Sequence, residues 1–133
     1  MLGEKISTVN GKVTATRVLP GEIPKIETSF QGAGKLLGVD TNDIGTYTSF
    51  LRSSGTFLGE GQGISVTKEG EVAKWRGFGI GKPTGKGIGA KYRYAISYES
   101  ESAKLSRLND FILVGEWEVD ADGNCSGGAW EWK

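Results

Sequence analysis

A two-residue alternation in the second half of the chain constrains the fold more than any other feature. From Ile88 to Tyr98 the even positions are apolar or aromatic, whereas the odd positions are small or cationic. From Phe111 to Asp120 the same period recurs, with one apolar face and one face that becomes acidic toward its end. Because successive side chains of a strand point to opposite faces, each stretch is predicted to be a strand with one buried face.

The polar faces of these two stretches carry opposite charges. Lys91 and Arg93 lie on the first stretch, and Glu116 and Glu118 lie on the second. If the two strands pair, we expect these side chains to lie opposite one another. Exposed cross-strand pairs of this kind contribute about 0.2–1 kcal/mol each, so they help to set the register more than the stability.

Glycine accounts for 22 of the 133 residues, and it recurs inside the predicted strands. Gly77, Gly79 and Gly81 share one face of a strand that begins near Val72, and Trp75 lies on the same face. Glycine weakens a strand, so a row of glycines indicates tight curvature or the close approach of another backbone or a large ring. A closing barrel and a contact between subunits both meet this description.

The rest of the chain predicts a meander of about eight or nine strands. Such a meander is expected to close into a barrel, because closure removes the exposed edges of the sheet. Segment 25–40 is either one long strand or two strands broken at Gly32–Gly34, and Ser100–Leu108 is the one helical signal, with Leu105 and Leu108 facing the sheet. The predicted turns are Asn10-Gly11, Pro20–Pro24, Thr41–Asp43, Arg52–Gly55, Lys68–Glu71, Lys82–Gly87 and Ala121–Asn124. The predicted fold is all-β, an antiparallel up-and-down barrel with one short helix before the C-terminal hairpin.

Length and charge set further bounds. A chain of 133 residues fits one domain, residues 1–133, with a single core. The 16 basic and 16 acidic side chains cancel without forming blocks, so we expect neither nucleic acid nor a membrane as a partner. The one cysteine, Cys125, permits no intrachain disulfide, and the N-terminus shows no signal-peptide pattern. A soluble, cytoplasmic protein is therefore predicted.

The residue types present exclude several chemistries. Without histidine, Ser-His-Asp and Cys-His catalysis within one chain are excluded, and a single cysteine cannot form a zinc site. Gly85-Lys86 lacks both the glycine five residues earlier and the following helix that a phosphate-binding P-loop requires. Asp120–Asn124 has its glycine at the fourth position instead of the sixth position of a calcium loop, and it is predicted to be a hairpin turn. We expect no metal and no cofactor.

Four parts of the sequence carry a family resemblance: Lys25–Phe50, Gly59–Gly63, Trp75–Gly81, and Glu116–Asn124 with Trp130–Lys133. Together they resemble a family of small uncharacterised prokaryotic proteins, whose barrels are similar in architecture to allene oxide cyclase and, more loosely, to calycins. The resemblance implies a barrel and a homo-oligomer. No catalytic motif of allene oxide cyclase maps onto this chain, so the resemblance assigns no site residue.

Candidate site residues form two groups. Glu60 is a weak catalytic candidate, because it lies on the same face as Leu58 and Ile64 and would have a raised pKa inside a lumen. The alternative for Glu60 is a position at the barrel mouth or a pair with Arg76. The candidates for binding a ligand are Gln62, Trp75, Arg76, Tyr92, Tyr94 and Trp117. Aromatic side chains in a small β protein more often form a core or a subunit interface, and that interpretation stays open for these.

Three functions follow from this pattern. The leading hypothesis is a non-catalytic barrel that binds a small hydrophobic ligand in its lumen. The second is an isomerase or cyclase of the allene oxide cyclase kind, in which the lumen and one carboxylate or tyrosine steer a reactive substrate. The third is a structural homo-oligomer with a filled lumen. An apolar cavity of ~300 Å³ or more would favour the first two, and an exposed Glu60 would remove the catalytic candidate.

Overall fold

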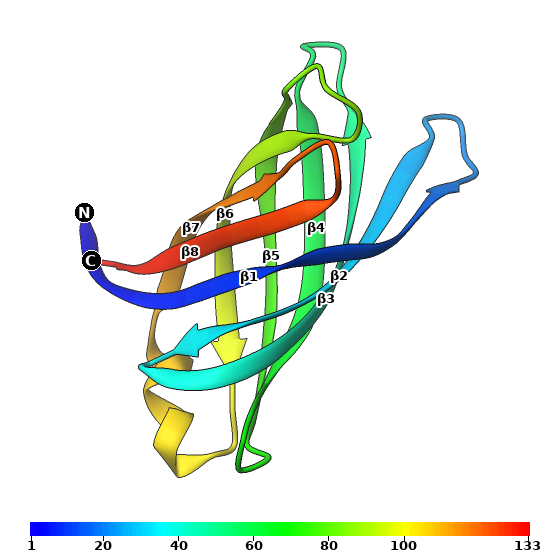
Figure 1. Cartoon of the computed structure of the whole chain (residues 1–133). Helices are drawn as coiled ribbons and strands as arrows, with labels where there is room; N and C mark the ends of the chain where they lie inside the picture. The colour runs from blue at the N-terminus through cyan, green and yellow to red at the C-terminus, as the bar shows by residue number, and fades with distance from the viewer.

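The computed structural model describes residues 1–133 as a closed barrel of eight antiparallel strands that are neighbours in chain order (Figure 1). The strands are β1 (Leu2–Leu19), β2 (Lys25–Leu36), β3 (Val39–Leu51), β4 (Phe57–Thr67), β5 (Val72–Pro83), β6 (Ala90–Glu99), β7 (Ile112–Val119) and β8 (Asn124–Trp132). A 3-10 helix, η1 (Ala103–Asp110), joins β6 to β7. Pairing of β1 with β8 closes the barrel, so the predicted fold class is confirmed. No helix has the length and hydropathy needed to span a bilayer.

The predicted hairpin at Asn10-Gly11 is wrong, because β1 continues through it from Leu2 to Leu19. Gly11 pairs with Gly32 of β2 on one side and with Cys125 of β8 on the other. A Cβ at position 11 would lie 2.2 Å from the backbone oxygen of Gln31. The glycine is therefore required where β1 and β2 approach closely inside the barrel, and this tertiary requirement overrides the local turn preference.

The predicted turn at Thr41–Asp43 is also wrong, since these residues belong to β3. The chain reverses instead at Leu37-Gly38, where φ is 52° and 78°. Two consecutive positive φ angles are typical of the tight loops that join twisted hairpin strands. β2 is unbroken at Gly32–Gly34, and β3 begins early enough to bring Asp43 to the inner face of the barrel.

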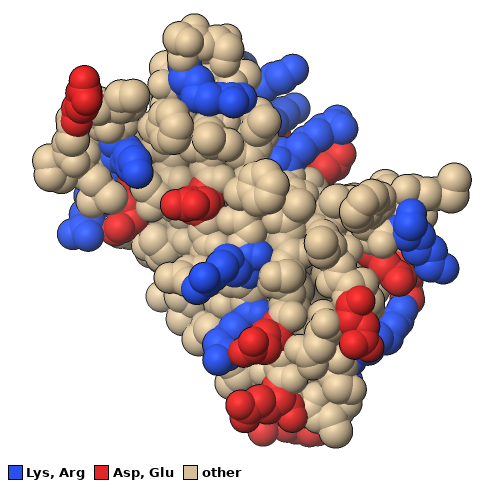
Figure 2. Space-filling model, turned by 180° about the vertical axis from the view of Figure 1, so that it is seen from behind, with Lys and Arg blue, Asp and Glu red and all other residues tan.

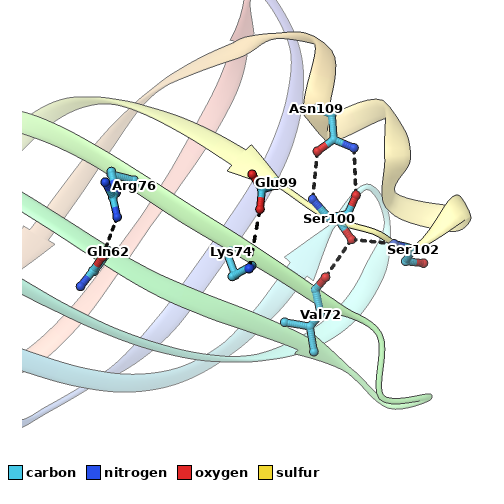
Figure 3. Close-up of polar contacts among 8 residues, drawn as sticks. All are labelled: Gln62, Val72, Lys74, Arg76, Glu99, Ser100, Ser102 and Asn109. Carbon is cyan, nitrogen blue, oxygen red and sulfur yellow. Dashed lines mark hydrogen bonds and ion pairs between the residues drawn. The ribbon is translucent and has the colours of Figure 1, made fainter.

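One end of the barrel is closed by η1, seen at the lower end of Figure 1. The helix begins three residues later than predicted and is a 3-10 helix, but Leu105 and Leu108 are fully buried as expected. Ser100 does not cap it. Asn109 instead holds the segment, accepting a bond from Ser100 N and donating one to Ser100 O, both at 2.9 Å (Figure 3). The helix thus packs its leucines into the end of the lumen.

Aromatic rings lie over glycines around most of the inner face. Each interface from β2–β3 to β7–β8 contains at least one directly paired aromatic residue and glycine, and a Cβ on the glycine would fall 2.5–2.8 Å from a side-chain atom of its aromatic partner. The pairs are Phe30–Gly45, Tyr47–Gly61, Trp75–Gly63, Tyr92–Gly81, Tyr94–Gly115 and Trp117–Gly127. The strand glycines therefore make room for large rings, as their spacing predicted.

On the face that Figure 2 shows, acidic and basic side chains are interspersed over the outer surface. Lys91 lies opposite Glu118 and Arg93 lies opposite Glu116, which confirms the predicted cross-strand arrangement. Both pairs have N···O distances of 4.0 Å and are well exposed. They therefore help to define the β6–β7 register and contribute little to stability.

Candidate functional site

A cavity of about 100 Å³ lies in the lumen between aromatic side chains and bare backbone. The backbone wall belongs to β4 and β5, where Gly59 pairs with Gly79 and Gly61 pairs with Gly77. With no side chain at four adjacent inner positions, this part of the lumen stays unfilled. The aromatic residues of the lining are Phe30, Tyr47, Trp75, Phe78, Tyr92, Tyr94, Tyr98 and Trp117. The volume is below the ~300 Å³ expected of a lumen built for an ordinary ligand, so that expectation is not met and most of the lumen is filled by the protein itself.

Of the six predicted ligand-binding residues, the four aromatic ones line this cavity: Trp75, Tyr92, Tyr94 and Trp117. Their contact with a ligand stays a prediction. Gln62 and Arg76 lie on the outer face, where Arg76 Nη2 donates to Gln62 Oε1 at 3.3 Å (Figure 3). This pair bridges β4 and β5 on the outside, so neither side chain reaches the lumen.

Glu60 is exposed on the outer face of β4, opposite Phe78 of β5. The expectation of a buried carboxylate is therefore wrong, and Glu60 forms no ion pair with Arg76, whose partner is Gln62. The main chain at Glu60 borders the cavity because its neighbours Gly59 and Gly61 have no side chains. Its carboxylate points away from any substrate in the lumen.

Asp43 is the carboxylate that the structure does place in the lumen, and sequence analysis missed it. It is 4% exposed and borders the cavity. Thr41 Oγ1 donates to Oδ2 at 3.0 Å, and Ser65 Oγ donates to Oδ1 at 2.5 Å. Burial raises the pKa of Asp43 and these two hydroxyl bonds offset part of the rise. Gly45 and Tyr47 face the lumen from the same strand, and continuing their two-residue alternation toward the N-terminus leads to Asp43.

Hydroxyl groups gather around Asp43 at this end of the cavity. Ser7 and Tyr98 also line it, and both are buried. Burial raises the pKa of Tyr98, and its proximity to Tyr94 and Asp43 raises it further, while the hydroxyls of Ser7 and Ser65 oppose the rise. The cavity therefore has one polar, acidic end within otherwise apolar walls.

The lumen tyrosines are hydrogen-bonding groups and not bases. Burial raises the pKa of Tyr47 and Tyr92, and it raises the pKa of Tyr94 to about 12. Tyr92 Oη donates to Ser49 Oγ at 3.4 Å, and Tyr94 Oη donates to Gly128 O at 3.5 Å. At neutral pH each phenol keeps its proton.

Trp117, whose ring borders the cavity, carries a buried indole N–H. Its Nε1 is buried and has no hydrogen-bond partner, and it is the only buried side-chain nitrogen or oxygen in this state. The Tyr47 hydroxyl lies nearby without meeting hydrogen-bond geometry. The ring packs against Phe30, with 4.7 Å between centroids, and lies over Gly127. An unsatisfied buried donor costs about 1–3 kcal/mol, so a partner supplied from the cavity would stabilise the protein.

No group of three His, Cys, Asp or Glu side chains comes together anywhere in the chain. The site therefore consists of one carboxylate, several hydroxyls, one free indole N–H and a set of rings. Such an arrangement can bind and orient a small molecule.

Comparison with known proteins establishes the architecture. No family model matches the sequence, and no curated protein matches it. A conserved protein of unknown function from Rhodopseudomonas palustris is similar in structure, with a TM-score of 0.81 and 14% identity over 99% of both chains. A protein of unknown function from Clostridium acetobutylicum has a TM-score of 0.82 and 12% identity over 98% of both chains. A β-barrel-like protein from Acinetobacter baumannii has a TM-score of 0.81 and 15% identity, covering 100% of this chain and 96% of the other.

These structures share the barrel over almost its whole length. At such low identity the likeness concerns the fold, and the function has to be argued from the lumen itself.

Proposed function

We propose that the protein binds a small, largely hydrophobic ligand in the barrel lumen. The observation that carries the proposal is the cavity between the aromatic rings and the glycine wall of Gly59, Gly61, Gly77 and Gly79. An empty cavity costs roughly 24 cal/mol per Å³, which for this volume is about 2 kcal/mol. A Cβ at Gly61, Gly77 or Gly79 would meet other atoms within 3 Å, so side chains at these positions do not fill the space, and a bound ligand would recover the lost contacts.

The cavity size limits the ligand to a few heavy atoms. An apolar cavity of about 150 Å³ can hold benzene, and this one, at about 100 Å³, is of the same order, so benzene marks the upper limit of ligand size. A resemblance in architecture to allene oxide cyclase and calycin-like barrels, some of which hold one small ligand, remains part of this proposal, which rests on the lumen itself.

The test is a titration of ¹⁵N-labelled protein with benzene, followed through the backbone amides and the Trp117 indole signal. We expect saturable shifts confined to the lumen strands. The control is Gly59→Val: position 59 borders the cavity, and a Cβ there would meet no atom closer than 3.4 Å. The variant should fold and lose the shifts. Shifts outside the lumen, or equal binding by the variant, would overturn the proposal.

The isomerase or cyclase alternative loses its candidate residue, because Glu60 lies on the outer face. A structural homo-oligomer is the second candidate function, and one surface favours it. A row of apolar residues crosses the outer face at one level, formed by Phe78, Ala95, Val114 and Trp130 of β5 to β8. Phe78 is 62% exposed and the other three are half-buried, and apolar surface left exposed in one place is typical of protein contacts.

Native mass spectrometry tests the oligomer directly. If the row is a subunit contact, Phe78→Asp should lower the subunit number, whereas Ile44→Asp, an exposed apolar position on β3, should leave it unchanged. A monomer for the unaltered chain would remove this candidate. A cytoplasmic location, predicted from the single cysteine, stays part of the proposal; Cys125 is free and buried.

A further inference from the structure

We propose that the lumen selects a small organic ammonium ion, whose N–H groups donate to the Asp43 carboxylate while its apolar part lies among the aromatic rings. This inference rests on the proposed function, because it assigns a chemical class to the ligand of the same cavity. Three observations support it: an uncompensated carboxylate, the absence of basic groups from the cavity wall, and the rings beside that carboxylate.

The Asp43 carboxylate has capacity for further hydrogen bonds. A carboxylate accepts at about four lone-pair sites, and only the hydroxyls of Thr41 and Ser65 are bonded to it. Both of these donors are neutral. Asp43 borders the cavity, so the remaining acceptor capacity is available to a donor placed there.

No cation of the protein compensates Asp43. It takes part in none of the ion pairs, whose acidic partners are all elsewhere. The cavity lining contains no lysine or arginine. A buried carboxylate is costly unless it is protonated or paired with a cation, so a positively charged ligand would remove this cost. The raised pKa of Asp43, caused first by burial, agrees with a missing countercharge.

Aromatic rings lie beside the carboxylate. The Trp75 ring covers Gly45 and Gly63, the next inner-face positions after Asp43 on β3 and before Ser65 on β4. The electrostatic influence of Asp43 on Tyr98 places that phenol near the same end of the cavity. Faces of tryptophan and tyrosine rings attract cations, most strongly where water is excluded. A carboxylate next to such rings therefore favours an ammonium group over a neutral group of the same size.

The competing explanation is that Asp43 only joins β3 to β4, as a protonated or hydrated hydrogen-bond acceptor. In that case the cavity would bind neutral molecules as well as cations of equal size. A pair of matched probes separates the two explanations: propylammonium and propan-1-ol have the same number of heavy atoms and differ in charge.

The experiment measures dissociation constants for both probes by NMR titration at neutral pH and constant ionic strength, on the unaltered protein, Asp43→Asn and Gly59→Val. We expect propylammonium to bind at least tenfold more tightly than propan-1-ol. Asp43→Asn, which keeps the side-chain size, should abolish that preference and still bind benzene. Gly59→Val should bind neither probe.

The outcomes distinguish this inference from the proposed function. Benzene binding without a preference for propylammonium leaves the lumen as a binding site and overturns the ammonium inference. Absence of binding by all three probes removes both. If Asp43→Asn fails to fold, the ratio of the two dissociation constants on the unaltered protein still decides the question. An ammonium preference that survives in folded Asp43→Asn would also overturn it.

Discussion

Tyr92 of β6 lies directly opposite Gly81 of β5, and its ring covers the glycine so closely that a Cβ there would fall 2.5 Å from Cε2. The three nearest atoms to that Cβ all belong to the Tyr92 ring. An aromatic ring covers its directly paired glycine in this way at five of the six strand interfaces from β2–β3 to β7–β8. Packing of rings onto glycines is how this barrel fills a narrow lumen with large side chains, and it can be tested one pair at a time.

Gly81→Ala is expected to lower the free energy of unfolding by about 1–3 kcal/mol, the usual cost of overpacking a core. The added methyl forces the Tyr92 ring out of position. Urea unfolding measures the change. Gly59→Ala is the matched control, since its Cβ meets nothing closer than 3.4 Å and should cost little. Replacing Tyr92 by leucine in the Gly81→Ala background should recover part of the loss, and strictly additive effects would contradict the ring contact.

Asp43→Asn is expected to raise the free energy of unfolding more at neutral pH than in acid. Burial raises the pKa of the folded Asp43 above its ordinary value of 3.8, so the folded protein holds this proton more tightly than the unfolded chain does. The resulting stability is fully present below that ordinary value and is lost as the pH rises through the folded-state pKa. A tenfold difference in proton affinity between the folded and unfolded chains corresponds to about 1.4 kcal/mol at neutral pH.

The measurement for Asp43 is the difference in unfolding free energy between variant and unaltered protein at about pH 7 and about pH 3.5. Comparing the two pH values cancels any constant cost of the altered hydrogen bonds to Thr41 and Ser65. Glu60→Gln is the control, because Glu60 is exposed and its replacement should change stability by less than about 0.5 kcal/mol. An equal effect of Asp43→Asn at both pH values would contradict the burial of an uncompensated carboxylate.

Cys125 is expected to be unreactive in the folded protein. It is 3% exposed, and burial raises the pKa of its thiol to about 11, so little thiolate is present at about pH 8. Titration with Ellman's reagent should detect the thiol only after denaturant is added. Rapid reaction of the native protein would show that the start of β8, where Cys125 lies, opens to solvent.

Asn109→Ala is expected to loosen η1 without opening the barrel. The Asn109 side chain bonds to both backbone groups of Ser100, and its loss leaves these part-buried groups unsatisfied at a cost of about 1–3 kcal/mol. Hydrogen exchange should increase in η1 while the amides of β2 to β4 keep their protection. Asn42→Ala, at an exposed position on β3, provides the comparison. Uniform loss of protection would mean that η1 and the barrel unfold together.

The site was predicted in part. Trp75, Tyr92, Tyr94 and Trp117 line the cavity, because each lies in a regular alternating strand whose apolar face was evident. Glu60 was assigned to the wrong face because β4 presents its bulkier apolar side chains outward and its glycines inward. Asp43 was missed because its neighbours resemble a turn, whereas β3 begins at Val39.

The sequence by itself determined that the chain forms antiparallel strands, which faces of β6 and β7 are apolar, and which charges meet across them. These features depend on nearest neighbours along and across a strand, and side-chain alternation encodes them directly. Only the tertiary structure decided that Asn10-Gly11 remains extended, that the glycine face of β4 points inward, and that Asp43 lies in the lumen. Closure of the barrel decides these three features. Its narrow interior admits a large ring only where the neighbouring strand supplies a glycine, and the ring and its glycine come from different strands.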